Sequence, residues 1–417
     1  MKTLSITIII LLGMFLPQIP CRAASKSQLA NAVYVTLPES YGTPRVTPVS
    51  DGIFGVQTDG KWSFYRISGG AIFSELPLKA PHSDPLFDSG VVIMEDTQSN
   101  PRQSNFVILY SNGTRKDLPS NWAVVTDFVD GVALVKAWDA RYNPTFFYIN
   151  TKGEQIWPHL NCSSGRSVEA TRRLSNNRRA FQRDGLWGYI DGDGRVVIEP
   201  QFVVARDFSE NHAAVTVNKN GQYTIGFIDL SGNFSFPPKL PGFGHDNTKI
   251  GDLHYGRIRV IEDEGISYYD ITGNRLMTYP HSKGTEFVDG YAMVTIPADN
   301  NVYDTGYVAL INPDFKKISE LDDTKGVFNV DNYHPVFCAK GYAPKKFHRE
   351  VMNPMGVSVI SEEEGNMDDM QTHYYPFSDD GYAFADLKIE GKYYYGIVDG
   401  AGNCVILFDR QAVPTQI

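Results

Sequence analysis

The sequence predicts an all-β protein, a β-propeller-like array of about eight or nine four-stranded repeats. Three observations predict this class. A turn marked by glycine recurs about every 41 residues, a second motif recurs out of phase with it, and no long window after the N-terminus shows helical periodicity. An open β-solenoid is the alternative architecture, because a solenoid tolerates a varying number of repeats.

The first 24 residues predict a secretory signal peptide. Lys2 supplies a positive charge, residues 4–16 form an uncharged run, and Cys21-Arg22-Ala23 offers small residues at the cleavage subsites. The run would rise only about 20 Å as a helix, short of the roughly 30 Å hydrocarbon core of a membrane. We therefore expect cleavage and export to the periplasm or the exterior, with lipid attachment at Cys21 as the less favoured alternative.

The rest of the chain divides into a lead-in over residues 25–48, a repeat domain over residues 49–410 and a C-terminal tail over residues 411–417. The lead-in is available to pair with the terminal hairpin at residues 395–408. No later segment approaches the roughly 18 apolar residues typical of a transmembrane helix, so none is predicted after the leader.

The chain is acidic, with 38 basic and 48 acidic residues and a formal net charge of −10. A nucleic-acid partner is not expected, because phosphate binding requires a basic face. After the leader only Cys162, Cys338 and Cys404 remain, a set too sparse for a disulfide framework. We expect buried cysteines and at most one disulfide among them.

The clearest repeat unit, at residues 184–198, reads Asp-Gly-Leu-Trp-Gly-Tyr-Ile-Asp-Gly-Asp-Gly-Arg-Val-Val-Ile. Residues 188–190 and 195–198 are β-branched or aromatic runs, and the Asp-Gly-Asp-Gly between them predicts a hairpin turn with positive φ. The turn glycine recurs at Gly70, Gly113, Gly153, Gly194, Gly232, Gly273 and Gly402, and two degraded copies are expected between the last two.

The second motif, which we call the aromatic-turn motif, is exemplified by Phe128-Val129-Asp130-Gly131. Strong copies begin at Phe128, Phe208, Phe287 and Phe377, and weaker copies are centred on Gly52, Gly90, Asn177, Gly256 and Gly341. These copies indicate nine units. Four short strands per unit are typical of a propeller blade, and such small sheets must cover each other, so the core is expected between units.

The string at residues 185–202 resembles the WG-repeat family of bacterial proteins, whose units share a Trp-Gly pair, an aromatic-Ile-Asp strand end and a downstream Pro-x-Phe. The resemblance covers about residues 50–408 and is strongest at the centre. It implies a β-rich, often exported repeat protein and carries no catalytic residue onto this chain. The structural residues of the repeat are then Trp187, Gly188, Asp191, Gly194, Gly232, Gly273 and Gly402.

Trp187 is expected to pack against the next unit, while Gly188 lets the ring or a neighbouring backbone approach. No nucleophile elbow, zinc-protease motif or phosphate-binding loop occurs, and the nine histidines are scattered singly. We therefore predict no catalytic residue, no metal ligand, no cofactor and no enzymatic activity. Carboxylates that meet across the array remain an open possibility for glycan hydrolysis.

Two departures from the repeat are candidate binding regions, although a solvated strand pair and a plain surface loop are the alternatives. The first is a basic cluster in an otherwise acidic chain, and the second lies at the end of a long step between aromatic-turn motifs. Their candidate residues are Arg172, Arg173, Arg178 and Arg179 in the first and Tyr342, Lys345, Lys346 and His348 in the second.

Together these features predict a non-enzymatic binding or protein-interaction scaffold of the cell envelope, whose partner is an unknown protein or glycan. The alternative is a glycan-acting hydrolase or lyase with carboxylates gathered at one mouth of the array. Two carboxylates at a fixed separation would be required for that chemistry.

Overall fold

The computed structural model describes residues 32–36, 45–82, 84–96, 105–162, 173–241, 249–287, 290–298, 301–322, 343–345, 350–352, 358–361, 378, 380–389, 392–399 and 403–408. The leader, the C-terminal tail, Gly402 and Cys338 lie outside these residues. Within this part of the chain the strands form nine sheets of three or four strands, which we number along the chain. The structure therefore confirms the all-β, propeller-like array.

Sheets 1 to 3 hold the first third of the array. Sheet 1 contains β2 (Arg45–Val46), β3 (Ile53–Thr58), β4 (Lys61–Arg66) and β5 (Ala71–Leu76); sheet 2 contains β6 (Val91–Asp96), β7 (Asn105–Tyr110) and β8 (Arg115–Asp117); sheet 3 contains β9 (Trp122–Val124), β10 (Val132–Trp138), β11 (Pro144–Asn150) and β12 (Gln155–Ile156). A short 3-10 helix, η1 (Pro158–Leu160), follows β12.

Sheets 4 to 6 form the middle of the array. Sheet 4 contains β13 (Arg179–Arg183), β14 (Leu186–Ile190) and β15 (Val196–Phe202); sheet 5 contains β16 (Val204–Ala205), β17 (His212–Lys219), β18 (Gln222–Asp229) and β19 (Phe234–Pro241); sheet 6 contains β20 (Ile250–His254), β21 (Arg257–Glu262), β22 (Gly265–Tyr269) and β23 (Arg275–Pro280).

Sheets 7 to 9 complete it. Sheet 7 contains β24 (Ala292–Ala298), β25 (Asn301–Ile311) and β26 (Lys317–Asp322); sheet 8 contains β27 (Ala343–Lys345), β28 (Glu350–Met352) and β29 (Ser358–Ser361); sheet 9 contains β30 (Tyr382–Ile389), β31 (Lys392–Asp399), β32 (Cys404–Phe408) and β1 (Val33–Val35).

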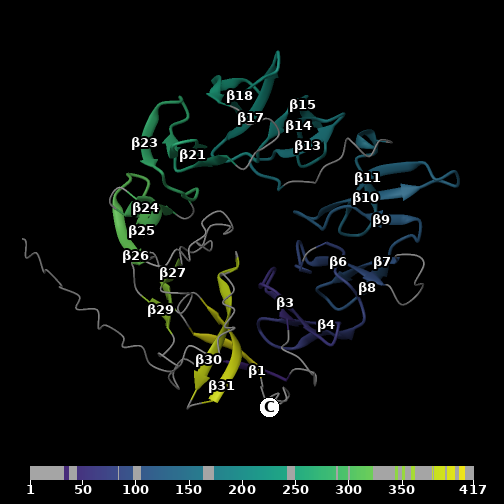
Figure 1. The fold of residues 1–417 in the computed structure, drawn as a ribbon. Helices are drawn as coiled ribbons and strands as arrows, with labels where there is room; N and C mark the ends of the chain where they lie inside the picture. Colours follow the sequence, from purple (N-terminus) through teal and green to yellow (C-terminus); the bar gives the residue numbers. More distant parts are fainter. Residues whose placement is uncertain are drawn as a thin grey trace, which may run out of the picture.

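Consecutive strands pair antiparallel within each sheet, and the sheets follow one another along an arc, with the first strand toward its middle and the last at its rim (Figure 1). In sheets 2 and 7 the innermost strand is reduced to a single bridge, Lys79 with Glu95 and Gly284 with Val294. Short inner strands explain why some units show three strands where four were expected.

The first and last sheets are neighbours. β1 pairs in parallel with β32, so the lead-in completes sheet 9, in the register Val33 with Ile406 and Val35 with Phe408. Val35 and Phe408 share a buried cluster with Phe54 of sheet 1. Gly52 of sheet 1 also donates its backbone N–H to Asp380, which precedes β30, at 2.8 Å.

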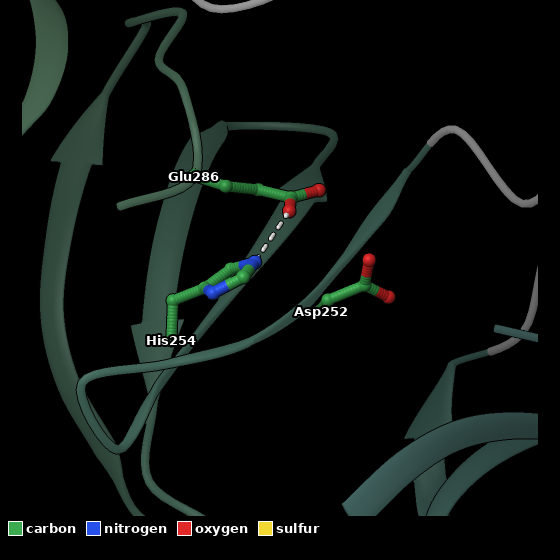
Figure 2. Close-up of side chains that lie close together, drawn as sticks. All are labelled: Asp252, His254 and Glu286. Carbon is green, nitrogen blue, oxygen red and sulfur yellow. Dashed lines mark ion pairs between the residues drawn. The ribbon is translucent and has the colours of Figure 1, made fainter. Parts of the chain in front are cut away.

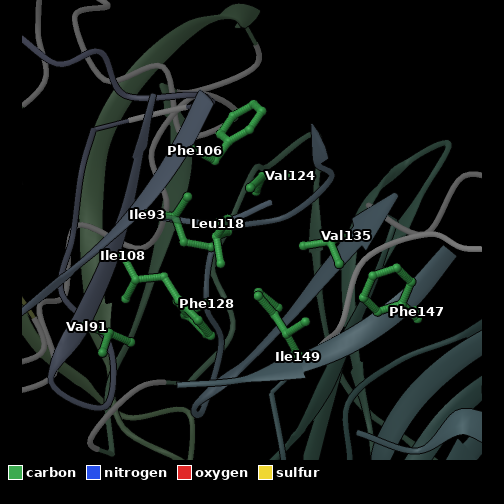
Figure 3. Close-up of a cluster of buried hydrophobic side chains, with 11 residues drawn as sticks. Val91, Ile93, Phe106, Ile108, Leu118, Val124, Phe128, Val135, Phe147 and Ile149 are labelled. Carbon is green, nitrogen blue, oxygen red and sulfur yellow. The ribbon is translucent and has the colours of Figure 1, made fainter. Parts of the chain in front are cut away.

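The core lies between sheets. In the cluster of Figure 3, Ile93 and Ile108 of sheet 2 face Val135 and Ile149 of sheet 3. Corresponding clusters join sheets 1 and 2, 3 and 4, 4 and 5, 5 and 6, and 6 and 7. A four-stranded sheet buries little by itself, so its stability depends on apolar area shared with the neighbouring sheets.

The repeat turn glycine is where one unit touches the unit before it. Gly194 has φ +79°, and a Cβ there would lie 2.2 Å from the ring of Trp157, which follows sheet 3. Gly273 has φ +83°, and its Cβ would lie 2.0 Å from Phe236 of sheet 5. A larger residue at either position would therefore meet both backbone strain and a neighbouring aromatic ring.

Candidate functional site

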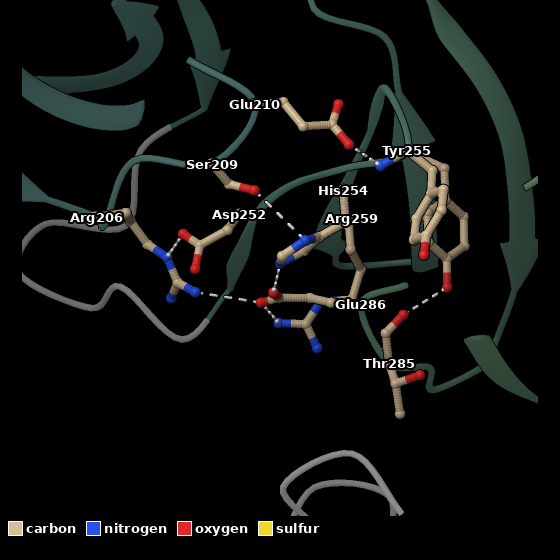
Figure 4. Close-up of polar contacts among 10 residues, drawn as sticks. Arg206, Ser209, Glu210, Asp252, His254, Tyr255, Arg259, Thr285 and Glu286 are labelled. Carbon is tan, nitrogen blue, oxygen red and sulfur yellow. Dashed lines mark hydrogen bonds and ion pairs between the residues drawn. The ribbon is translucent and has the colours of Figure 1, made fainter. Parts of the chain in front are cut away.

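Ionisable side chains from three consecutive sheets converge at the inner edges of sheets 5, 6 and 7. Arg206 follows the inner strand β16, Asp252 and His254 lie on the inner strand β20, and Glu286 precedes β24 (Figure 4). We call Arg206, Asp252, His254, Arg259 and Glu286 the inner-edge cluster. Their side chains are between 15% and 36% exposed, so solvent reaches them only in part.

Arg206 bridges the two carboxylates. Its Nε lies 2.6 Å from Asp252 Oδ1 and its Nη2 lies 3.2 Å from Glu286 Oε1. Burial alone lowers the pKa of Arg206, but the hydrogen bond to Asp252 and the charges of Asp252 and Glu286 raise it above its usual value. The guanidinium is therefore a fixed positive charge that binds sheet 5 to sheets 6 and 7.

Glu286 occupies space that only a glycine leaves. A Cβ at Gly251 would lie 2.7 to 2.8 Å from Glu286 Cγ, Cδ and Oε1, so the carboxylate rests against the backbone of β20. Arg259 on β21 approaches from the other side, with Nη2 3.9 Å from Glu286 Oε1 and Nη1 donating to Gly284 O at 3.1 Å. Contacts from sheets 5 and 6 thus fix the Glu286 carboxylate.

His254 completes the cluster. Its Nε2 lies 3.6 Å from Glu286 Oε2 (Figure 2), and its Nδ1 lies 3.5 Å from Ser209 Oγ in the preceding aromatic-turn motif. The next residue in that motif, Glu210, accepts the backbone N–H groups of Tyr255 and Gly256. The turn that follows His254 is therefore anchored to sheet 5.

The arrangement offers two kinds of chemistry. Among the described residues, Asp252, His254 and Glu286 each place one ligand atom within 4.8 Å of the others, near enough to reach one metal ion after small side-chain rotations. The same side chains also form an ion-pair network that joins three sheets. The sequence predicted no metal ligands here, since spacing along the chain does not show this convergence.

The basic candidates of the sequence separate in the structure. Arg179 is only 2% exposed and donates to Val129 O and Asp130 O of sheet 3 at 2.9 and 3.3 Å. Arg178 donates to Leu230 O of sheet 5. Arg179 therefore does not contribute to a surface patch, because its guanidinium satisfies carbonyl groups of the preceding unit.

Arg173 is exposed, and its binding role remains a prediction. The other candidates, Arg172, Tyr342, Lys346 and His348, lie outside the described residues. Only the backbone of Lys345 is described, in β27.

Among the structural residues of the repeat, Trp187 lies in the junction between sheets 4 and 5. Trp187 is 6% exposed and packs in a cluster with Phe202 of its own sheet and Val215 of sheet 5. A Cβ at Gly188 would lie 2.5 Å from Ile198 O, so the outer strand passes directly over it. Asp191 Oδ1 accepts the N–H groups of Asp193 and Arg195, which makes this segment a closed hairpin turn.

The inner-edge cluster had a sequence signature that the aromatic-turn motif alone does not include. The residue immediately before the motif's aromatic or apolar position is acidic in four units, at Asp127, Asp207, Asp252 and Glu286. An acid repeated at one phase of a propeller unit marks one edge of successive sheets. This repeated position would have predicted that Asp252 and Glu286, two members of the cluster, lie at the same edge of neighbouring sheets.

Residues 187–221 match the family model described as WG containing repeat. A search of curated proteins found no match. Within the described part of the chain, no helix has the length and hydrophobicity that a membrane crossing needs.

Among solved structures, the chain is similar to the β-propeller domain of the Trilobed protease from Pyrococcus furiosus, at 12% identity and a TM-score of 0.31, covering 68% of this chain and 99% of that one. It is also similar to Kluyveromyces lactis Hsv2, at 12% identity and a TM-score of 0.35, covering 67% and 99% respectively. A structure from a study of two prolyl endopeptidases gives 10% identity and a TM-score of 0.38, covering 78% and 47%.

No activity follows from such distant likenesses. The repeat match, the strand order and the cores between sheets agree with the resemblance that the sequence predicted. The chain is therefore a β-propeller-like repeat protein that carries a WG containing repeat at residues 187–221.

Proposed function

We propose that the protein is an exported, non-enzymatic binding scaffold of the cell envelope, whose partner is a protein or a glycan. The N-terminal sequence supports export, since it has the charge, uncharged run and small residues of a cleavable leader. The repeat array supports a scaffold, because stacked units build a broad surface on which unit-to-unit differences select a partner.

The observation that carries the proposal is how the inner-edge cluster balances its charges. Arg206 contacts both Asp252 and Glu286, and the three residues come from three different sheets. These ion pairs hold the side chains of a partly solvent-exposed surface in fixed positions. It supports recognition through fixed, oriented polar groups, which lose little entropy when a partner binds.

Affinity capture of envelope extracts on the immobilised mature protein tests this proposal, with cross-linking to identify the contact. We expect Arg206→Gln to reduce partner capture at least tenfold, while Arg195→Gln, in an exposed turn of sheet 4, leaves it unchanged. Circular dichroism establishes that both variants are folded. Capture that is equal for the parent and the Arg206 variant would contradict a role for this surface.

A glycan-acting hydrolase or lyase is the second candidate, favoured by the meeting of Asp252 and Glu286. A glycosidase of the usual kind places a pair of carboxyl groups about 5 to 9.5 Å apart around the bond to be cleaved. Here a guanidinium lies between the two groups, which favours binding over cleavage. Turnover on a polysaccharide panel that is lost in Asp252→Asn and Glu286→Gln would establish the enzyme and overturn the scaffold.

A further inference from the structure

We propose that Asp252, His254 and Glu286 bind a divalent transition-metal ion of the Zn²⁺ type. The inference does not depend on the proposed scaffold function, because it concerns the purified chain alone. A metal site requires three donor atoms that can approach one point, groups that orient these donors, and space that other residues leave free.

The donor atoms lie near the separations that a metal site requires. His254 Nε2 and Glu286 Oε2 are 3.6 Å apart, and the ligand atoms of all three residues lie within 4.8 Å of one another. Ligands bound at about 2.0 to 2.2 Å in a tetrahedral zinc site are roughly 3.4 Å from each other. Small side-chain rotations would therefore bring the third donor into range.

Two of the three residues share one strand face. Asp252 and His254 are two positions apart on β20, and side chains at that spacing point to the same side of a strand. Glu286 reaches them from the segment before β24 (Figure 2) and rests against Gly251, the residue before Asp252. The space that its carboxylate occupies thus exists because residue 251 has no side chain.

The atoms that would not bind the ion are already engaged. Arg206 contacts Asp252 Oδ1 and Glu286 Oε1, and Ser209 Oγ lies next to His254 Nδ1 (Figure 4). In metal sites, such partners orient each ligand and fix the tautomer of the histidine. Here they leave Glu286 Oε2 and His254 Nε2 facing one another.

The charges of the cluster set the affinity and the choice of ion. Arg206 and Arg259 offset the two carboxylates, so the site attracts a cation less strongly than an uncompensated acidic pair would. An imidazole donor favours Zn²⁺, Ni²⁺ or Cu²⁺ over Mg²⁺ and Ca²⁺, which prefer all-oxygen sites. We expect micromolar binding of Zn²⁺ and no competition from millimolar Mg²⁺ or Ca²⁺.

Calorimetric titration of the chelator-treated mature protein with zinc chloride tests the site. We expect one ion per chain, with affinity reduced at least tenfold in His254→Ala and Glu286→Gln and unchanged in His82→Ala, which removes an exposed histidine elsewhere.

Gly251→Ala supplies a test that keeps every donor. The added Cβ displaces the Glu286 carboxylate, so zinc affinity should fall at least tenfold while the circular dichroism spectrum and melting temperature of the metal-free protein stay near those of the parent. No saturable uptake by the parent, or uptake that survives in His254→Ala, would overturn the proposal. Neither result would bear on partner capture, so the two proposals fail separately.

Discussion

Trp187 shows how one side chain links two units. The ring belongs to sheet 4, but its cluster includes Ala205, Phe208 and Val215 of sheet 5. Gly188, the next residue, lies so close to Ile198 O that no side chain fits there. The Trp-Gly pair therefore combines a large apolar group for the interface between sheets with a close backbone approach inside one sheet.

We expect Trp187→Ala to lower the free energy of unfolding by about 3 to 5 kcal/mol, because it removes a buried aromatic group and leaves a cavity. The neighbouring Leu186→Ala is the control. Leu186 is 39% exposed, so its truncation should cost under about 1 kcal/mol. Urea unfolding measures both, and equal transition midpoints for the two variants would refute the packing role.

Cys404 makes the stability depend on alkaline pH. The thiol is 2% exposed in β32 and donates to Ile406 O at 3.1 Å, and burial raises its pKa to about 12. In the unfolded chain a thiol ionises near pH 8.5. Between about pH 9 and 12 the unfolded state thus loses a proton that the folded state keeps, which favours unfolding as pH rises.

Cys404→Ala should remove this contribution to the pH dependence. We expect the parent to lose up to about 1.4 kcal/mol more stability per pH unit above pH 9 than the variant does. Buried Tyr148 and Tyr268 also have raised pKa values, but both proteins retain them, so the difference isolates the thiol. Parallel stability curves in urea at pH 8 to 10.5 would contradict the assignment.

At the scale of elements, the aromatic-turn motifs are joined by bonds from a carboxylate in one unit to backbone N–H groups in the next. Asp51 accepts from Gly90 at 2.7 Å, and Asp88 accepts from Asp130 and Gly131 at 3.0 and 2.9 Å. Asp130 in turn accepts from Leu174 at 2.6 Å. The acid of the motif thus sets the positions of sheets 1, 2 and 3, each relative to the sheet after it.

We expect Asp88→Ala to destabilise the protein by about 1 to 3 kcal/mol, because two N–H groups lose a charged acceptor. Asp193→Ala is the matched control, since Asp193 pairs at an exposed turn with Arg195 of its own unit and should change stability by less than about 1 kcal/mol. Hydrogen exchange at Asp130 and Gly131 provides the local readout. Unchanged protection there in the Asp88 variant would disprove the bond's role.

The sequence could predict the repeated turns but not the inner-edge cluster, and the residues of each show why. Turn glycines such as Gly194 and Gly273 recur because each needs positive φ and room for a neighbouring ring, so their spacing gave the sheets and their order. Arg206, Asp252 and Glu286 belong to three units, and their contact depends on how sheets 5, 6 and 7 pack. Spacing along the chain contains no measure of that distance.

Arg179 shows the same limit for a residue that the sequence placed in a surface cluster but that is buried in the structure. A cluster of arginines in an acidic chain favours a surface patch, since a buried guanidinium is costly unless it is paired. The carbonyl groups of Val129 and Asp130 supply that pairing, and they come from the preceding unit. Burial of this charge therefore follows from tertiary contacts and not from local composition.

At the scale of the whole molecule, three contacts join the start of the array to its end. β1 adds three residues to the edge of β32, Val35 enters the cluster between sheets 9 and 1, and Asp380 binds Gly52 as the acids of other motifs bind their neighbours. An uncovered β32 would present unpaired backbone groups, which is a liability for any edge strand. β1 of the lead-in thus covers the outer edge of β32, while sheet 1 covers the apolar face of sheet 9.

A chain that begins at residue 41 should lose this cover, whereas a chain that begins at residue 32 should keep it. We expect hydrogen exchange in residues 404–408 to accelerate at least tenfold in the shorter chain, because β1 no longer accepts or donates along β32. Exchange in β17 and β18 of sheet 5, on a distant part of the array, should be the same in both chains (Figure 1). Equal protection of residues 404–408 in the two chains would show that β1 does not stabilise sheet 9, and faster exchange throughout would show that its loss unfolds the array as one unit.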